Sequence, residues 1–185
     1  MKKAAGGVSG GTISASSGVL RPWIPPSPGE FKMNVDAACF DDINGGGVGA
    51  LIRDCKGNVM LVISLFIEPL VEVAAMEALA ILHACVVAGE ERFTDLIVET
   101  DSEVVAKGFT SGSHEFSSFG HILDAIRSLA PVVCSSRIRF TPRSGNGMAH
   151  NLARYAKIHR SHYISSEFFP PCIHSLMCTE VFSDD

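Results

Sequence analysis

The chain has 185 residues, of which 46% are apolar and 19% charged, and it carries a net charge of −5. This composition provides apolar material for one well-buried α/β domain, and a second domain is not expected. No apolar run approaches the roughly 20 residues that span a bilayer, so we expect no membrane segment. The six cysteines include no Cys-x-x-Cys pair, which argues against a structural zinc site and is typical of a reduced intracellular protein.

We predict three regions along the chain. Residues 1–29 are expected to be a disordered leader rich in Gly, Ser and Pro, residues 30–160 the folded domain, and residues 161–185 a C-terminal tail of unassigned role. The leader carries basic residues and no acid before residue 30, so an organelle transit peptide is an alternative interpretation. We otherwise expect an intracellular protein of the nucleus or cytoplasm, and a monomer.

The first part of the domain predicts an antiparallel meander. Residues 31–38 alternate apolar and polar side chains, the period of a half-buried strand, and Asp36 lies within this strand. Strands joined by short turns pair in an antiparallel fashion. The strands are expected at 31–38, 47–53 and 59–67, joined by turns at 41–46 and 54–58.

The second part of the domain predicts helices that alternate with short strands. Meander, helix, strand, helices, strand and helix together give a mixed sheet with helices on its faces, so the predicted class is α/β. The helices are expected at 71–88, 102–109, 117–130 and 147–159, and the strands at 96–98 and 137–141.

Two further acids occupy informative positions. Glu77 lies in an apolar stripe, because the residues three and four positions away on its helix are apolar. A carboxylate there has to be neutralised, hydrogen-bonded or bound to a cation, unless it lies at the edge of the stripe and reaches solvent. Asp101 ends an apolar strand just before a helix, where it either binds a ligand or caps the helix, a task that Ser102 could also perform.

Asp36, Glu77 and Asp101 come from elements that could bring them near one point. Clustered carboxylates repel one another unless a hard dication lies between them, and oxygen ligands suit Mg²⁺ or Mn²⁺. The charge distribution is consistent with a phosphate-bearing partner, although a solvated basic face explains it equally well. Between residues 127 and 160 there is no acid, and the basic residues are Arg127, Arg137, Arg139, Arg143, Arg154, Lys157 and Arg160.

Short motifs occur along the chain in a recognisable order. They are Asn34-Val35-Asp36-Ala37-Ala38, Gly47-x-Gly49-Ala50-x-Ile52-Arg53-Asp54-x-x-Gly57, Glu77-Ala78-x-Ala80, Glu99-Thr100-Asp101-Ser102 and Arg143-x-x-Asn146-x-x-Ala149-x-x-Leu152-Ala153. Together they resemble the type 1 ribonuclease H domain, most of all the plant version found in reverse-transcriptase-like elements. The resemblance covers about residues 21–160, including a lead-in with Trp23.

The resemblance implies a ribonuclease H-like fold, with a five-stranded mixed sheet of three antiparallel strands followed by two parallel ones and helices on both faces. It implies an endonuclease that cleaves the RNA strand of RNA–DNA hybrids with two Mg²⁺ or Mn²⁺ ions. In that mechanism Asp36, Glu77 and Asp101 would be catalytic residues that bind the metal. The candidate contacts to the nucleic acid are Asn34, Asn44, Arg143 and Asn146.

The sequence departs from the family pattern at His150. The family commonly has a fourth acid at this place, in an Asn-x-x-Ala-Asp segment, and His150 takes its position in the catalytic set. An imidazole is a poorer Mg²⁺ ligand than a carboxylate but accepts protons and binds Mn²⁺. Three functions therefore stay open: an active ribonuclease, a nucleic-acid-binding module with weak or no activity derived from a retroelement ribonuclease H, and a relic that only contacts proteins.

Overall fold

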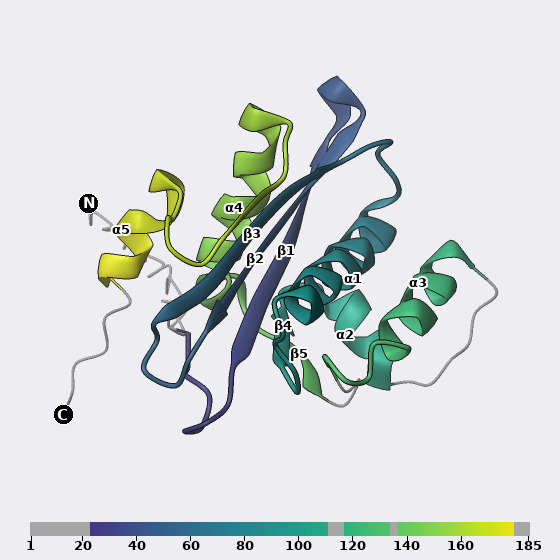
Figure 1. Cartoon of the computed structure of the whole chain (residues 1–185). Helices are drawn as coiled ribbons and strands as arrows, with labels where there is room; N and C mark the ends of the chain where they lie inside the picture. The colour runs from purple at the N-terminus through teal and green to yellow at the C-terminus, as the bar shows by residue number, and fades with distance from the viewer. Residues whose placement is uncertain (1–22, 111–116, 134–136, 180–185) are drawn as a thin grey trace, which may run out of the picture.

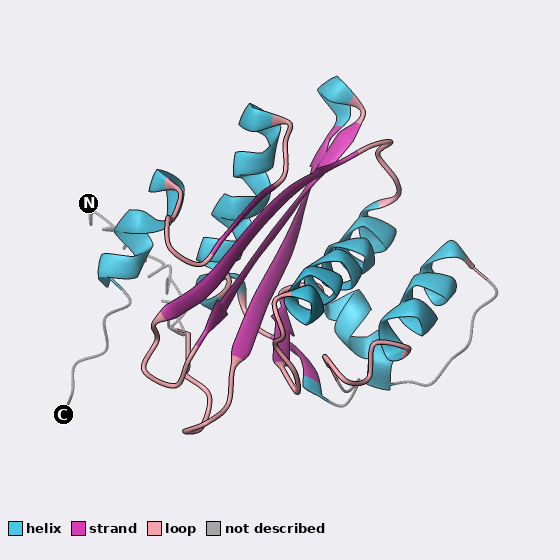
Figure 2. Cartoon of the chain, viewed as in Figure 1, coloured by secondary structure: helices cyan, strands magenta, loops and turns pink. Residues whose placement is uncertain are grey.

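A six-stranded mixed sheet runs through the protein. The computed structural model describes residues 23–110, 117–133 and 137–179. The strands are β1 (Lys32–Phe40), β2 (Gly45–Arg53), β3 (Val59–Ile67), β4 (Ile97–Thr100), β5 (Ile138–Phe140) and β6 (Tyr163–Ser165). Their order in the sheet is β5-β4-β1-β2-β3-β6. The strands are drawn in magenta in Figure 2. The β1-β2, β2-β3 and β3-β6 pairs are antiparallel, whereas β4 is parallel to β1 and β5 is parallel to β4.

Helices cover both faces of this sheet (Figure 1). On one face lie α1 (Val73–Glu90), α2 (Glu103–Thr110) and α3 (Ser118–Arg127), and on the other lie α4 (Gly147–His159) and α5 (Pro171–Thr179). The 3-10 turns η1 (Asp41–Ile43) and η3 (Arg143–Gly145) lie in the loops of the described residues. The strands alternate their side chains between two cores, so that Val35 packs with the α1 layer and Leu51 with the α4 layer.

The predicted fold class is confirmed, but the predicted strand count of five is wrong. The additional strand β6 pairs with β3, and Ile173 of α5 is buried against the α4 layer. Sequence patterns miss β6 because three residues of mixed polarity carry no periodic signal. Trp23, which the sequence assigned to the leader, is also buried, with the Arg53 guanidinium 3.5 Å above its ring. The earlier part of the expected leader and the end of the expected tail lie outside the described residues.

The reversal between β1 and β2 is shorter than the turn expected at 41–46. The turn η1 and Asn44, in the left-handed conformation with φ 46°, make the reversal, and β2 already begins at Gly45. Gly45 and Gly46 serve packing inside the sheet, because a Cβ on either would lie 2.5 Å from the side chain of Phe66 or Met76. The other elements lie where the patterns predict them, with ends shifted by a few residues.

Two glycines let α4 approach β2 closely. A Cβ on Gly47 would lie 2.0 Å from the carbonyl oxygen of Ala153, and one on Gly49 would lie 2.1 Å from that of Ala149. The Ser64 hydroxyl of β3 donates a hydrogen bond of 2.9 Å to the Leu152 carbonyl, which also holds the helix on the sheet. The start of α4 is thereby pressed against the sheet beside β1.

The helix α1 is the one described helix that has the length and apolar composition of a membrane span. Half of it is buried within the protein, and its buried residues include Met76 and Ile81 in the core of the α1 layer. We therefore interpret α1 as a core helix, in line with the expectation from the sequence.

We expect Gly49→Ala to lower the free energy of unfolding by about 1–3 kcal/mol or more, because the new methyl group would meet backbone atoms of α4 that cannot rotate away. Urea denaturation followed by circular dichroism measures the change. Gly147→Ala is the matched control, since its Cβ would meet only a Leu176 methyl group at 3.4 Å. Equal stability of the two variants would contradict the close approach of α4.

Candidate active site

Asp36 lies in the middle of β1, between β2 and β4, and its side chain is completely buried. Val35 on one side of it points into the α1 core, and Asp36 itself points to the opposite face, as the alternation of a strand requires. Its partner across the β1-β2 ladder is Gly49, which has no side chain. A carboxylate in this position is held rigidly and largely shielded from water.

The structure brings Glu77 and Asp101 to Asp36. One carboxylate oxygen from each of the three lies within 4.8 Å of the other two. Glu77 extends from the middle of α1, and Asp101 follows directly after β4, which runs parallel to β1. Ser102 caps α2, because its hydroxyl accepts a hydrogen bond of 3.4 Å from the Val105 amide. Of the two residues that the sequence offered as the cap of α2, the structure therefore uses Ser102 and not Asp101.

Burial and mutual repulsion raise the pKa of two of these acids. The pKa of Asp36 rises to about 8, mainly through burial and then through the charges of Asp101 and Glu77. The positive charge of Arg143 lowers the same pKa and so partly offsets this rise. The pKa of Glu77 rises to about 7 through burial and then through the charge of Asp101, while the Ala37 amide and Arg143 lower it. Among the described residues, Oδ1 of Asp36 and Oε2 of Glu77 have no hydrogen-bond partner. Ionising such a pair without a cation is costly.

His150 lies in the first turn of α4, with its Nδ1 atom 2.8 Å from Oδ2 of Asp36. Burial and the charges of Arg143 and Arg154 lower the pKa of the imidazole, which favours its neutral form. His150 therefore lies directly beside Asp36, and its role in the catalytic set stays a prediction.

Arg143 extends from η3 into the acidic cluster. Its Nη1 atom lies 2.7 Å from Oδ2 of Asp101 and 3.5 Å from Oδ1 of Asp36, and its Nη2 atom lies 2.6 Å from Nδ1 of His150. The side chain is 57% exposed. The sequence predicted Arg143 as a contact to nucleic acid, and its place among the carboxylates was not expected.

The two buried asparagines make internal hydrogen bonds that position the site, and their contact to nucleic acid stays a prediction. Asn34 is 0% and Asn146 1% exposed, so neither side chain reaches the surface. Asn34 donates to Glu99 at 3.1 Å and accepts from Arg53 at 3.0 Å. Asn146 donates to the Val35 carbonyl at 2.9 Å and to Asp101 at 3.3 Å, which ties the start of α4 to β1 and β4.

Asn44 has a different position from the two buried asparagines. It is exposed at the turn that follows η1. Its contact to nucleic acid stays a prediction.

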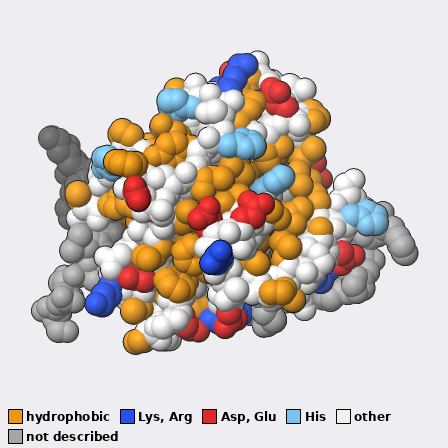
Figure 3. Space-filling view, viewed as in Figure 1, with side chains coloured by type: hydrophobic (Ala, Val, Ile, Leu, Met, Phe, Trp, Pro, Cys, Tyr) orange, Lys and Arg blue, Asp and Glu red, His pale blue; other side chains and the backbone are white. Residues whose placement is uncertain are grey.

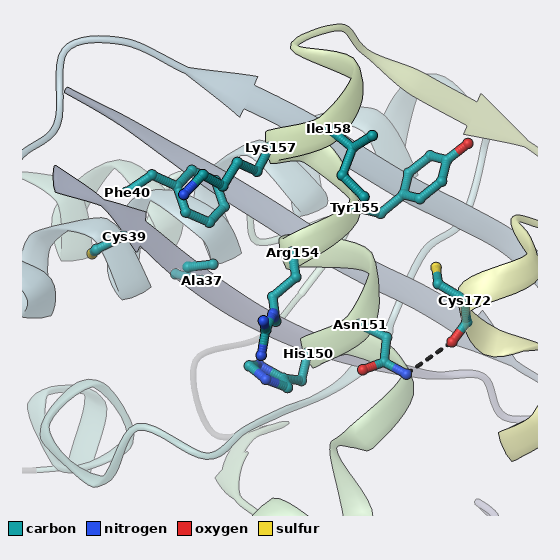
Figure 4. A pocket seen from close by; sticks show the side chains of 11 residues that line it. Ala37, Cys39, Phe40, His150, Asn151, Arg154, Tyr155, Lys157, Ile158 and Cys172 are labelled. Atoms are coloured by element: carbon teal, nitrogen blue, oxygen red, sulfur yellow. Dashed lines mark hydrogen bonds between the residues drawn. The ribbon is translucent and has the colours of Figure 1, made fainter. Parts of the chain in front are cut away.

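A groove of about 750 Å³ runs from His150, beside this cluster, along α4 and the end of β1 (Figure 4). His150 lines the groove at the start of α4, and the Arg154 side chain extends toward its imidazole. Lys157 lines the groove nearer the end of α4. Phe40 and Tyr155 add aromatic rings to the lining. Sequence analysis missed these two rings as candidates, because β1 and α4 are more than 100 residues apart and no local pattern joins them.

The face of the protein that Figure 3 shows does not carry a continuous basic patch. In Figure 3, the Lys and Arg side chains on the viewed face are scattered among hydrophobic and neutral ones. Several members of the basic run are paired with acids, for example Arg137 with Asp95 at 2.7 Å and Arg127 with Asp124 at 2.7 Å. Any binding of phosphates is therefore expected at specific basic residues near the groove.

The three carboxylates fit a divalent cation. All their donor atoms are oxygens, the ligands that Mg²⁺ and Mn²⁺ prefer, and two of the buried oxygens have no hydrogen-bond partner among the described residues. Asp36, Glu77 and Asp101 are the residues that would hold the ion, and the ion would offset the repulsion that helps to raise the pKa values of Asp36 and Glu77.

A mixed sheet flanked by helices, with acids from β1, α1 and the end of β4 at one point, defines a ribonuclease H-like domain. The model of the reverse transcriptase-like family matches residues 34–156, which include Asp36, Glu77, Asp101 and His150. The chain belongs to this family. None of the curated proteins matches it.

Solved structures similar to this protein share the fold at low sequence identity. The RNase H1 of the halophilic archaeon Halobacterium salinarum is 21% identical with a TM-score of 0.61, over 71% of this chain and 99% of its own. LC11-RNase H1 in complex with an RNA/DNA hybrid is 18% identical with a TM-score of 0.58, over 71% and 99%. The N-terminal RNase H domain of a Mycobacterium tuberculosis protein is 16% identical with a TM-score of 0.60, over 70% and 94%.

We expect Asp36→Asn to stabilise the metal-free protein at alkaline pH. The folded-state pKa of about 8 exceeds the ordinary value of 3.8, so the folded state binds the proton more tightly. Stability of the wild type should therefore fall as pH rises from about 4 to above 8, and the asparagine lacks this contribution. Urea unfolding in EDTA across this range measures the effect.

The control for this experiment is Glu103→Gln, which removes an exposed carboxylate of α2 that is paired with Lys107. It should leave the fall of stability with pH unchanged. A parallel pH dependence in the wild type and Asp36→Asn would show that Asp36 is not buried as an acid with a raised pKa.

Proposed function

We propose that this domain is a metal-dependent endonuclease that cleaves the RNA strand of RNA–DNA hybrids. The observation that carries the proposal is the convergence of Asp36, Glu77 and Asp101, with oxygens within 4.8 Å of one another, in a ribonuclease H-like fold. Clustered, partly unpaired carboxylates of this kind have a chemical use in binding hard dications. The family match, which spans these residues, further supports the proposal.

Each residue of the site has a defined task in this mechanism. Divalent ions bound here would supply Lewis-acid stabilisation and an activated water for displacement at phosphorus. Asp36 is held in place by β1, and its Oδ2 atom is engaged by His150, which leaves Oδ1 directed toward the cluster. Asn146 orients Asp101 and ties α4 to β1. We propose two Mg²⁺ or Mn²⁺ ions, with His150 favouring Mn²⁺ because imidazole is a poorer ligand for Mg²⁺.

The substrate class rests on the fold and on the groove beside the acids. LC11-RNase H1 shares the fold and was crystallised with an RNA/DNA hybrid, and we extend this substrate to the present chain. Arg154 and Lys157 line the groove and offer cations to phosphates. We further propose that the domain acts as an intracellular monomer, in the nucleus or cytoplasm, and derives from a plant retroelement.

We expect the purified protein with Mn²⁺ or Mg²⁺ to cleave the RNA strand of a labelled hybrid, and Asp36→Asn to abolish cleavage while it retains binding of the hybrid. The variant removes a metal ligand without changing the size of the side chain, so the fold should persist. Gel analysis of the labelled RNA strand measures cleavage, and circular dichroism monitors the fold. Full cleavage by Asp36→Asn would show that the reaction does not require the Asp36 carboxylate.

A nucleic-acid-binding module without activity is the second candidate, and the observation that favours it is His150 beside Asp36 where the family has an acid. In this case the wild type binds the hybrid and leaves it intact. His150→Asp then discriminates between the two functions, because a restored carboxylate should give Mg²⁺-dependent cleavage to a module that had lost it.

We expect Arg154→Gln to weaken hybrid binding and to reduce the slope of log K against log salt by about one unit, because one phosphate contact is lost from the groove. Fluorescence anisotropy in Ca²⁺ between low and moderate salt measures the slope. Lys56→Gln is the control, since Lys56 lies in the turn between β2 and β3 at the far end of β1 from the groove. Equal slopes for both variants would show that the nucleic acid does not contact Arg154 in the groove.

A further inference from the structure

The guanidinium of Arg143 contacts the oxygens that a divalent ion would need. Nη1 lies 2.7 Å from Oδ2 of Asp101 and 3.5 Å from Oδ1 of Asp36, and both residues belong to the three-carboxylate cluster. An ion bound to the same oxygens would lie within a few ångströms of this positive charge, in a site that is partly shielded from water. The ion and the guanidinium therefore compete for the same ligands.

The backbone of Arg143 is fixed, whereas its side chain is open to solvent. In η3, the Gly145 amide donates to the Pro142 carbonyl at 2.8 Å, and the Asn146 amide donates to the Arg143 carbonyl at 3.0 Å. The buried side-chain amide of Asn34 also donates a hydrogen bond to the Gly145 carbonyl, at 3.4 Å. The Arg143 side chain, in contrast, is 57% exposed. The side chain can thus leave the carboxylates by rotation about its own bonds while the turn stays in place.

We propose that Arg143 is an internal counter-cation of the metal-free site, which a divalent ion has to displace in order to bind. The proposal rests on the metal binding that is part of the proposed function. In the metal-free protein Arg143 offsets the repulsion among Asp36, Glu77 and Asp101, which stabilises the fold. When metal is present the same charge opposes binding, so Arg143 sets the concentration of metal at which the site fills.

Neighbouring cations do not take this role. Lys157 is engaged by Asp42 at 2.8 Å, away from the cluster. Arg154 acts on the His150 imidazole and lines the groove. Among the described residues, Arg143 is the Lys or Arg that forms ion pairs with Asp36 and Asp101. Removing its charge should therefore change metal affinity far more than removing a charge elsewhere.

Titration of the full chain with MnCl₂ by isothermal calorimetry tests the proposal. Arg143→Gln should bind Mn²⁺ about tenfold more tightly than the wild type, because the competing charge is gone. Arg143→Lys keeps the charge and should stay close to the wild type. Lys56→Gln, which removes a charge from the turn between β2 and β3, should leave the affinity unchanged.

A stability measurement separates this role from a purely structural one. In EDTA, Arg143→Gln should unfold at lower urea than the wild type, and saturating Mn²⁺ should bring the two to the same midpoint. Equal Mn²⁺ affinities, or an equal loss of stability with and without Mn²⁺, would overturn the proposal while metal binding itself stands. If neither protein binds Mn²⁺, both this proposal and the metal-dependent function fail.

Discussion

The repulsion among three acids in one partly buried place is the constraint on which the structure depends. Asp36, Glu77 and Asp101 approach within 4.8 Å, and burial raises the pKa of Asp36 to about 8 and that of Glu77 to about 7. A fold built for stability alone would not gather these groups, because each ionised acid makes the next one costlier. The arrangement persists because rigid elements hold the backbone and because positive charge, from Arg143 or from a metal, offsets the repulsion.

Rigidity at the site comes from both layers of the protein. The glycines of β2 allow α4 to lie against the sheet, and Asn146 then ties the start of that helix to the Val35 carbonyl and to Asp101. Beneath the site, Asn34 links Glu99 and Arg53, and Lys32 pairs with Glu99 at 2.7 Å. These buried polar groups bind one another, so they fix the position of η3 and β4 relative to β1. A small displacement of α4 would therefore be felt directly at the carboxylates.

The part of this arrangement that the sequence predicts depends on local patterns. Strand alternation located Asp36, and the helical spacing around Glu77 marked it as a carboxylate within an apolar stripe. Family resemblance joined them to Asp101. Long-range contacts leave no local pattern in the sequence. Asn34 contacts Gly145, which is 111 residues away. The strand β6 forms by pairing with the edge of β3. Gly47 and Gly49 were recognised as part of a motif. The reason that glycine is needed there is the close approach of α4, about 100 residues later, which only the folded chain shows.

The basic run of the last third shows how folding changes the meaning of charge in the sequence. Arg127, Arg137 and Lys157 meet acids in ion pairs on the surface, so the segregation of acid and base along the chain largely disappears in space. Exposed pairs of this kind contribute little to stability, and a phosphate can replace the acid of such a pair at small cost. Arg143 differs because its partners are the site acids themselves. Under the proposed function, exchange at Arg143 would therefore change the metal occupancy of the site, whereas exchange at Lys157 would change only how a nucleic acid is held along the groove.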